Sequence, residues 1–307
     1  MKNLIQRCTI TGLIVFSLLS GIITQCTDDC REGPLKNALI WRISGNDLPA
    51  PSYLFGTIHV VDSNDISVHS TIIEQLRRAD ALVFETNLKD PQYQQLALQH
   101  AMMEHDSLEG ILPTDQFDVV KRFFLDEFDF PVEAVSKMKP FYIASLMGAL
   151  DAKGKSKSHE EVLMEIAGKE AKMITGISTL EKESELIDKI DMKDQAAYML
   201  TEIEAYRNGE SELLKNEMMQ AYEKADIEMI HVLISESLAD FPVVFDQLFV
   251  SRNESWLPAM VALMHEQSCF FAVGVGHLPG ESGLIRLLRK NGYKVSPVKM
   301  DFWFHDR

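Results

Sequence analysis

Short apolar runs bounded by turn residues recur near both ends of this 307-residue chain. Residues 38–43 form one such run, and the following segment 44–52 carries glycine, asparagine, aspartate and two prolines before a second run at 53–59. This pattern predicts a β-hairpin. Further apolar runs of strand length predict strands at 81–85, 172–177, 269–275 and 293–298.

Helical spacing dominates the remainder of the chain. Residues 70–79 carry Ile72, Ile73 and Leu76 on one face, which predicts a helix between the strands 53–59 and 81–85. The order strand, helix, strand predicts that these two strands are a parallel pair. The long stretches 90–168 and 181–265 and the short stretch 281–290 have helical patterns, and the second stretch breaks at Phe241-Pro242.

These elements predict an α/β fold. We expect a mixed central sheet built from the N- and C-terminal parts of the chain, with a long helical middle region covering it. Two interpretations of the middle region stay open. The helices form a wall or lid over a site at the sheet, or they only cover the sheet.

The first residues have the pattern of an export signal. Residues 1–25 start with Lys2 and Arg7 and continue with the apolar stretch 10–23. Cys26 follows directly, as the lipidated cysteine of a bacterial lipoprotein does, although Gln25 is larger than the usual preceding residue. We therefore expect residues 1–25 to be a signal peptide, 26–37 a short tether and 38–307 one domain. A lipoprotein, a plainly cleaved or uncleaved signal and a retained anchor remain alternatives, and all place the protein in the exported or envelope fraction.

Charge excludes one class of partner. The chain has 30 basic and 46 acidic residues, a formal net charge of −16. Such a surface repels phosphate backbones, so we expect no nucleic-acid binding, and a membrane contact only through the N-terminal anchor. Cys269 lies in a strand-like apolar run and is expected to be a packed thiol.

Two distant segments share one pattern. Gly56-Thr57-Ile58-His59 closes the apolar run at 53–55, and Gly274-Val275-Gly276-His277 closes the run at 269–273. If the two strands are neighbours, both imidazoles emerge at one rim of the sheet, where ligands bind in open α/β folds. Glu85 ends a third strand in the same way. Two imidazoles and one carboxylate can hold a divalent metal cation that activates water. Each residue alone is more often structural.

The same segments resemble a known family. Tyr53–His59 is similar to the opening motif of the TraB/GumN family, 273–284 to its closing motif, and 81–85 to its acidic strand. Ser251-Arg252-Asn253 with Trp256 resembles its Arg-Asn segment. The resemblance runs from about residue 38 to 298 and implies a fold shared with TIKI-like, erythromycin-esterase-like and ChaN-like proteins.

The resemblance also implies roles for single residues. His59, Glu85 and His277 match the positions regarded as active-site residues of TIKI-like proteases. Arg252 and Asn253 match the Arg-Asn positions, where Arg252 would stabilise an oxyanion. Hydrogen bonding at a helix N-terminus or between helices is the alternative for both.

One departure from the family pattern concerns the middle strand. Family members commonly have Gly-Leu-Glu-Thr there, whereas this chain has Gly176-Ile177-Ser178-Thr179. Serine thus replaces an acid, and Glu181 is expected to lie in the next helix, where it is a poor substitute. An inactive or altered member of the family therefore stays open.

Together these observations predict an envelope-associated or secreted metal-dependent hydrolase. The favoured activity is that of a protease acting on peptide bonds of a peptide or protein substrate through a metal-activated water. The alternative is a non-catalytic envelope protein that binds haem or a partner protein on the same fold, and a structural lipoprotein without ligand is a third interpretation. His100 and His105 are expected at the surface, and His305 in a tail that packs on the domain.

Overall fold

The computed structural model describes residues 33–58, 61–62, 68–151 and 156–300. The chain divides into two units, Met1–Gly33 and Pro34–Arg307, and the fold below belongs to the second. The predicted signal segment with Cys26, the predicted ligand His59 and the tail residue His305 lie outside the described residues.

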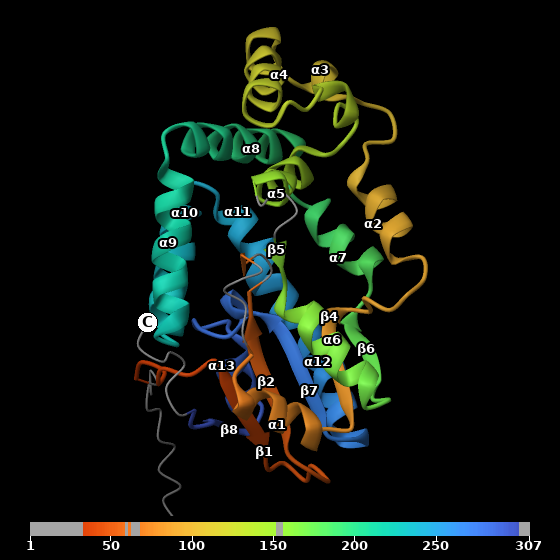
Figure 1. The fold of residues 1–307 in the computed structure, drawn as a ribbon, viewed down its shortest axis with the longest axis vertical. Coiled ribbons are helices and arrows are strands. Elements are labelled where there is room, and N and C mark those ends of the chain that lie inside the picture. Colours follow the sequence, from red (N-terminus) through yellow and green to blue (C-terminus); the bar gives the residue numbers. More distant parts are fainter. Residues whose placement is uncertain (1–32, 59–60, 63–67, 152–155, 301–307) are drawn as a thin grey trace, which may run out of the picture. The chain divides into compact units, whose positions relative to one another are not determined.

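A six-stranded mixed sheet forms the centre of the second unit, with the strand order β6-β4-β7-β2-β1-β8 (Figure 1). Its strands are β1 (Ile40–Ser44), β2 (Ser52–Thr57), β4 (Ala81–Thr86), β6 (Met173–Ser178), β7 (Cys269–Gly274) and β8 (Lys294–Pro297), and a two-stranded sheet pairs β3 (Val61–Asp62) with β5 (Ser156–Lys157). The α/β prediction with a mixed central sheet is confirmed.

The predicted hairpin is present. β1 and β2 pair antiparallel with Trp41 opposite Leu54, and β8 pairs antiparallel with the other edge of β1. β2 pairs in parallel with β7, and the two ends Thr57 and Gly274 are in register. The two Gly-x-x-His segments therefore start from neighbouring positions on neighbouring parallel strands, as the sequence pattern anticipated.

One expected pairing differs. β2 and β4 run in the same direction, but β7 lies between them and pairs in parallel with both. The strand-helix-strand pattern correctly predicts direction but cannot exclude insertion of a strand from the distant C-terminal part. β7 is buried along its whole length, which suits a central position in the sheet.

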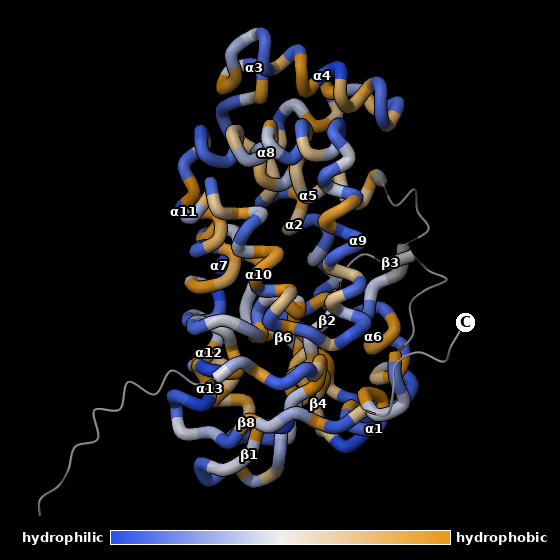
Figure 2. The backbone as a smooth tube through the Cα atoms, turned by 90° about the vertical axis from the view of Figure 1, so that its left-hand side faces the viewer, coloured by the Kyte–Doolittle hydropathy of each residue, from blue (hydrophilic) through white to orange (hydrophobic). Residues whose placement is uncertain are grey.

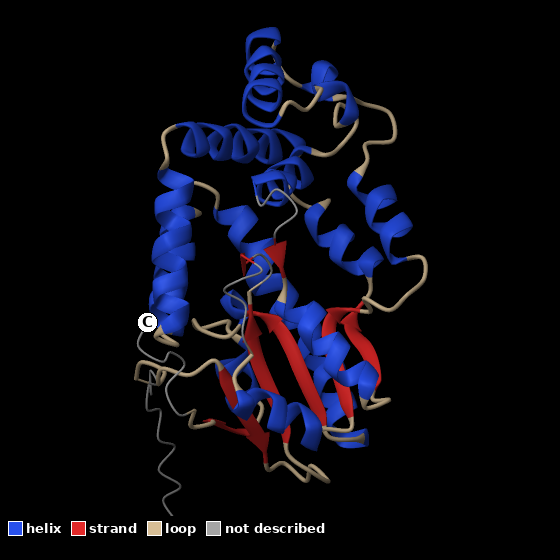
Figure 3. Cartoon of the chain, viewed as in Figure 1, coloured by secondary structure: helices blue, strands red, loops and turns tan. Residues whose placement is uncertain are grey.

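Helices account for most of the remaining chain (Figure 3). They are α1 (Ser70–Arg78), α2 (Tyr93–Ala101), α3 (Leu108–Ile111), α4 (Thr114–Phe128), α5 (Pro140–Asp151), α6 (His159–Lys169), α7 (Leu180–Ile187), α8 (Met192–Arg207), α9 (Glu210–Glu223), α10 (Ile227–Ser237), α11 (Pro242–Phe245), α12 (Ser251–Glu266) and α13 (Leu284–Lys290). Two 3₁₀ segments, η1 (Val132–Ala134) and η3 (Val275–His277), and one π-helical segment, η2 (Asp246–Val250), complete the described elements.

The sheet is covered from both sides. α1 packs on β2 and α6 on β4 and β6, while α12 contacts β6 and α13 contacts β8. α13 starts three residues later than its sequence pattern predicts, because the loop before it contains Gly280 with φ +84° and Gly283, whose Cα lies against the Pro279 carbonyl. Hydrophobic and hydrophilic residues alternate along the helices, which is typical of elements with one buried face (Figure 2).

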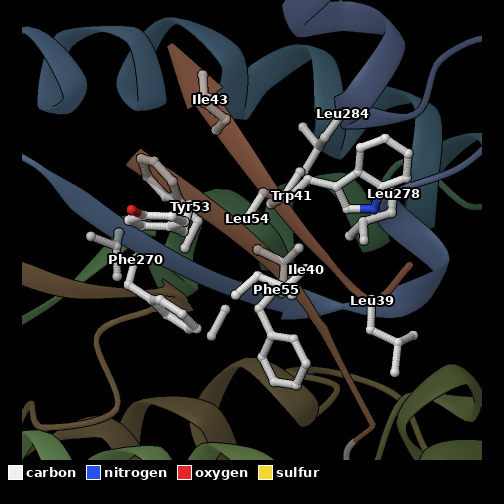
Figure 4. Packing of buried hydrophobic residues seen from close by; sticks show 14 of the residues in the cluster. Leu39, Ile40, Trp41, Ile43, Tyr53, Leu54, Phe55, Phe270, Leu278 and Leu284 are labelled. Carbon is white, nitrogen blue, oxygen red and sulfur yellow. The ribbon is translucent and has the colours of Figure 1, made fainter. Parts of the chain in front are cut away.

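The main core surrounds the sheet. Trp41, Leu54 and Phe270 are fully buried in it, together with Leu278 and Leu284 from the segment after β7 (Figure 4). Each such side chain contributes roughly 1.5–3 kcal/mol through removal of apolar surface from water. A second core, made by α3, α4, α5 and α8, belongs to the helical middle region, so this region has a packed interior of its own.

Among the described residues, none of the helices combines the length and the apolar character that a membrane crossing requires.

Candidate functional site

Glu85 and His277 meet at the carboxyl ends of β4 and β7. Oε1 of Glu85 accepts a hydrogen bond from the backbone N–H of Gly274 at 2.8 Å. The same oxygen lies 3.7 Å from Nε2 of His277, which ends the 3₁₀ turn directly after β7. Two of the three predicted ligands are therefore adjacent because their strands are neighbours in the sheet.

Asn253 determines the orientation and the tautomer of His277. Its amide nitrogen donates to the backbone carbonyls of His277 at 3.2 Å and Ser282 at 2.9 Å, so its oxygen must face the ring. That oxygen lies 2.8 Å from Nδ1 of His277. Because an amide oxygen only accepts, Nδ1 carries a proton, so the neutral imidazole has its lone pair on Nε2, the nitrogen that faces Glu85. A second polar group that orients a histidine in this way is typical of metal sites.

Aromatic rings hold the imidazole in place. The ring centroid of Trp256 lies 4.5 Å from that of His277, and the centroid of Phe249 lies 5.2 Å away. His277 is 5% exposed and Asn253 is 2% exposed. The ring is therefore fixed by packing and by a hydrogen bond, and it cannot turn without disturbing both.

Arg252 lies between two carboxylates. Its Nη1 is 4.0 Å from Oε2 of Glu85, and its Nε is 2.8 Å from Oε2 of Glu183. The Nε contact is an ion pair that lacks the alignment of a hydrogen bond. Oε1 of Glu183 accepts a hydrogen bond from the indole N–H of Trp256 at 2.8 Å. Glu183 thus holds the guanidinium at a position where it also faces Glu85.

Glu85, Arg252 and His277 border a cavity of about 270 Å³. One part of its lining is polar and consists of Thr57, Glu85, Arg252 and His277. The other part is apolar and comes from Ile58, from α9 and α10, and from the π-helical segment η2. A small cavity with convergent polar groups at strand ends has the features of a ligand or active site.

Two glycines of the paired motifs permit close packing here. A Cβ on Gly56 would lie 2.9 Å from a methyl group of Val275, so β2 can approach the turn after β7 only with glycine at this position. A Cβ on Gly276 would lie 2.7 Å from the Phe249 ring and 2.8 Å from Cδ1 of Ile234. Glycine at these two positions therefore allows neighbouring segments of the chain to pack closely against each other.

Comparison with known proteins identifies the family of this chain. Residues 39–297 match the TraB/PrgY/gumN family. The chain belongs to this family. The match covers both Gly-x-x-His segments and every described strand of the central sheet.

Two relatives of this TraB/PrgY/gumN member are named metalloproteases. Metalloprotease TIKI2 of Xenopus tropicalis is 24% identical over 330 residues, which covers 84% of this chain and 59% of the relative. Metalloprotease TIKI2 of Danio rerio is 24% identical over 329 residues, covering 84% of this chain and 60% of the relative. The chain thus spans about three fifths of the length of these relatives. No solved structure gives a significant match.

The described part of this TraB/PrgY/gumN site supplies two groups of ligand type. Two ligands of one tetrahedral zinc ion lie roughly 3.4 Å apart, and Nε2 of His277 lies 3.7 Å from Oε1 of Glu85. One imidazole nitrogen and one carboxylate oxygen suit a divalent cation. Among the described residues no cluster of three His, Cys, Asp or Glu side chains has the geometry of a metal site. The third predicted ligand, His59, lies outside those residues.

Ser178, the expected departure from the family pattern, lies at the end of β6 opposite Thr86. It lines a separate cavity of about 300 Å³ together with Glu181. Glu181 lies in α7 as expected, and backbone hydrogen bonding, followed by Thr179, lowers the pKa of its carboxyl. The acid that reaches Arg252 is instead Glu183, two positions further along the same helix.

Sequence reasoning missed Glu183. The available signal was its position on the inward face of α7, three and four residues before the buried Leu186 and Ile187. An acid on an apolar stripe is buried only when it has a partner, and here the partners are Arg252 and Trp256.

A second buried polar group, also missed, lies beside β2. Glu160, at the start of α6, accepts a hydrogen bond from the Thr57 hydroxyl and is 8% exposed. The Tyr222 hydroxyl donates to the carbonyl of Gly56 at 2.8 Å, and burial, with a further contribution from the Glu160 charge, raises the pKa of Tyr222 well above its ordinary value. Glu160 and Glu85 line one cavity of about 240 Å³, so two carboxylates face the same space.

The remaining histidine predictions concern the surface. The His105 side chain is 92% exposed, which confirms the expectation for that residue, and His100 is partly exposed in the last turn of α2.

Proposed function

We propose that this protein is a metal-dependent hydrolase that cleaves peptide bonds. The observation that supports the proposal is the facing pair of Glu85 and His277, in which Asn253 accepts from Nδ1 and the neutral imidazole therefore has its lone pair on Nε2, on the side of Glu85. The metalloprotease names of the two TIKI2 relatives support the same reaction class.

His277 and Glu85 would bind the cation, and His59 is retained from the sequence prediction as the third ligand. A divalent cation bound there would polarise a substrate carbonyl and acidify water. Asn253 keeps the Nδ1 proton of His277 in place and so maintains Nε2 as an electron-pair donor. The Gly274 N–H fixes one oxygen of Glu85.

Arg252 would stabilise negative charge on the reacting carbonyl oxygen. Its guanidinium lines the same cavity as Glu85 and His277 and retains donors beyond the Nε that faces Glu183. Glu183 and Trp256 fix its position, so the positive charge is already in place when negative charge develops.

We also propose that the protein acts in the cell envelope. The basic and apolar residues 1–25, followed by Cys26, support export with either lipid anchoring or release outside the cytoplasm. The test is separation of the cytoplasm from the envelope and secreted fractions, with detection of the chain in each, and recovery of the chain in the cytoplasm alone would remove this part of the proposal.

The catalytic proposal is tested with the purified full chain. Metal content is measured by mass spectrometry after incubation with Zn²⁺, Mn²⁺ or Co²⁺ and desalting, and a mixed peptide library is digested under the same conditions. The variants are Glu85→Gln and His277→Ala, and the control is His105→Ala at an exposed position.

We expect about one metal ion per wild-type chain, metal-dependent cleavage, and loss of both in the two site variants but not in the control. Metal binding without cleavage of any peptide would favour the non-catalytic ligand-binding protein. Equal metal content in wild type and both site variants would contradict the site itself.

A further inference from the structure

We propose that the apolar part of the cavity beside His277 receives an uncharged, apolar side chain of the substrate and thereby sets the residue preference next to the cleaved bond. This inference rests on the proposed peptidase function and names its substrate class. The residues that would determine specificity are Met218 of α9, Ile234 of α10, and Leu248 and Phe249 of η2.

The first support is the distance of these side chains from the reacting groups. A Cβ on Gly276 would collide with Phe249 and Ile234, so both side chains rest against the backbone immediately before His277. Phe249 also contacts the His277 ring at 5.2 Å between centroids. The apolar wall is therefore next to the proposed ligand, within the reach of one substrate residue.

The second support is the local backbone of the wall. Asp246–Val250 forms a π-helical turn, in which the N–H of Ser251 donates to the carbonyl of Asp246. Such turns are rare and frequently occur at functional sites. This one carries Leu248 and Phe249 on the cavity wall and leads directly into Arg252 and Asn253, so one short segment supplies both apolar and polar sides of the site.

The third support is the size and charge of the space. The cavity volume of about 270 Å³ accommodates a single side chain of leucine, methionine or phenylalanine size. Its charged lining groups are Glu85 and Arg252, which lie with His277 at the end where the bond would be cleaved. A charged substrate side chain on the apolar wall would lose its hydration without gaining a partner, which disfavours it.

The experiment uses the full chain with the metal that gives the highest activity and a set of peptides that differ at one position on either side of the cleaved bond. The varied residues are Ala, Leu, Met, Phe, Asp and Lys. We expect kcat/KM to be roughly 10–200-fold higher for Leu or Met than for Ala at one of the two positions, and lower still for Asp and Lys.

Two variants change the wall in opposite directions. Ile234→Ala enlarges the cavity and should shift the preference toward Phe, whereas Met218→Trp reduces it and should shift the preference toward Ala. Leu213→Ala is the control, because Leu213 lies on α9 with 65% exposure and does not line the cavity. Thermal unfolding of each variant identifies any that fail to fold. If a variant fails to fold, the peptide series with the wild-type protein decides whether an apolar residue is preferred.

Cleavage with no preference for an apolar residue on either side of the bond would overturn this inference and leave the peptidase proposal intact. An apolar preference that stays the same in both folded variants would overturn the assignment to this wall. Cleavage of no peptide at all would remove the peptidase proposal and this inference with it.

Discussion

The amide oxygen of Asn253 lies 2.8 Å from Nδ1 of His277, so Nδ1 carries a proton and Nε2 is the nitrogen that faces Glu85. The orientation of the amide is not free, because its nitrogen donates to the carbonyls of His277 and Ser282. Two backbone carbonyls therefore determine, through the amide of Asn253, that Nδ1 of His277 is the nitrogen protonated in the neutral ring. The orientation of the His277 imidazole therefore depends on a residue 24 positions earlier.

Asn253→Ala tests this dependence. We expect metal affinity to fall about 10–100-fold, because the ring loses the acceptor that orients it. We also expect the free energy of unfolding to fall by about 1–3 kcal/mol, because buried polar groups lose their partner. Calorimetric metal titration and chemical denaturation measure the two effects. Asn216→Ala, which removes only an exposed contact with Glu212, is the control, and equal affinities in all three proteins would contradict the role assigned to Asn253.

Glu183→Gln tests the ion pair with Arg252. The substitution keeps the side-chain size but removes the charge that lies 2.8 Å from Nε, so we expect a loss of roughly 1–3 kcal/mol in the free energy of unfolding. Glu212→Gln is the matched control, because its pair with Lys215 is exposed and should be worth less than about 1 kcal/mol. A double-mutant cycle of Glu183 and Arg252 by urea denaturation measures the coupling, and a coupling near zero would refute the pairing.

Gly56→Ala and Gly148→Ala should change stability in opposite directions. A Cβ at position 56 meets Val275 at 2.9 Å, so we expect a loss of about 1–3 kcal/mol from overpacking. A Cβ at position 148, inside α5, meets nothing within 4 Å, so alanine should stabilise the helix by up to about 1 kcal/mol. Thermal unfolding of both variants is the measurement, and stabilisation by Gly56→Ala would show that the two segments are not in contact.

Cys269 should resist alkylation in the folded protein. Burial, followed by the negative charges of Asp80 and Glu266, raises the pKa of its thiol to about 12. Iodoacetamide at pH 8 requires the thiolate, so the peptide containing Cys269 should stay unmodified until denaturant is added. Peptide mapping by mass spectrometry separates this residue from the other three cysteines. Rapid modification without denaturant would show that β7 is accessible.

The same raised pKa predicts a pH effect on stability. The unfolded thiol has an ordinary pKa of 9.0 and the folded thiol about 12, so the unfolded state loses its proton first as the pH rises. The stabilising contribution of the neutral thiol is complete below pH 9.0 and is lost between pH 9.0 and about 12. Cys269→Ala should therefore show a shallower loss of stability in this window, measured by urea denaturation at each pH. If the free energy of unfolding fell equally with pH in wild type and Cys269→Ala, the raised pKa of the Cys269 thiol would be contradicted.

Local sequence patterns predicted the strands of the sheet and drew attention to two candidate site residues that lie side by side. Glu85 and His277 were found because each follows a buried apolar run, and the ends of parallel strands collect at one edge. The distance of 3.7 Å between Nε2 of His277 and Oε1 of Glu85 could not be predicted, because it depends on β4 and β7 being neighbours. The strand-helix-strand rule had placed β4 beside β2 instead.

Glu183 and Glu160 were missed by the same methods. Acids near the start of a helix usually stabilise its N-terminus in contact with water, and both residues have such positions in α7 and α6. Their burial follows from what packs on the helix, namely Arg252 and Trp256 in one case and Thr57 in the other. That information lies at least 69 residues away in the chain.

The sequence by itself determined the α/β class, the family pattern, and the glycines at the ends of β2 and β7, because periodicity and backbone requirements are local properties. Only the tertiary structure decided that Asn253 sets the tautomer of His277, that Glu183 holds Arg252, and that Phe249 and Ile234 form an apolar wall beside the site. These relationships join segments that have no local preference for each other. They exist because burial of the sheet brings the segments together and because each buried polar atom then requires a partner.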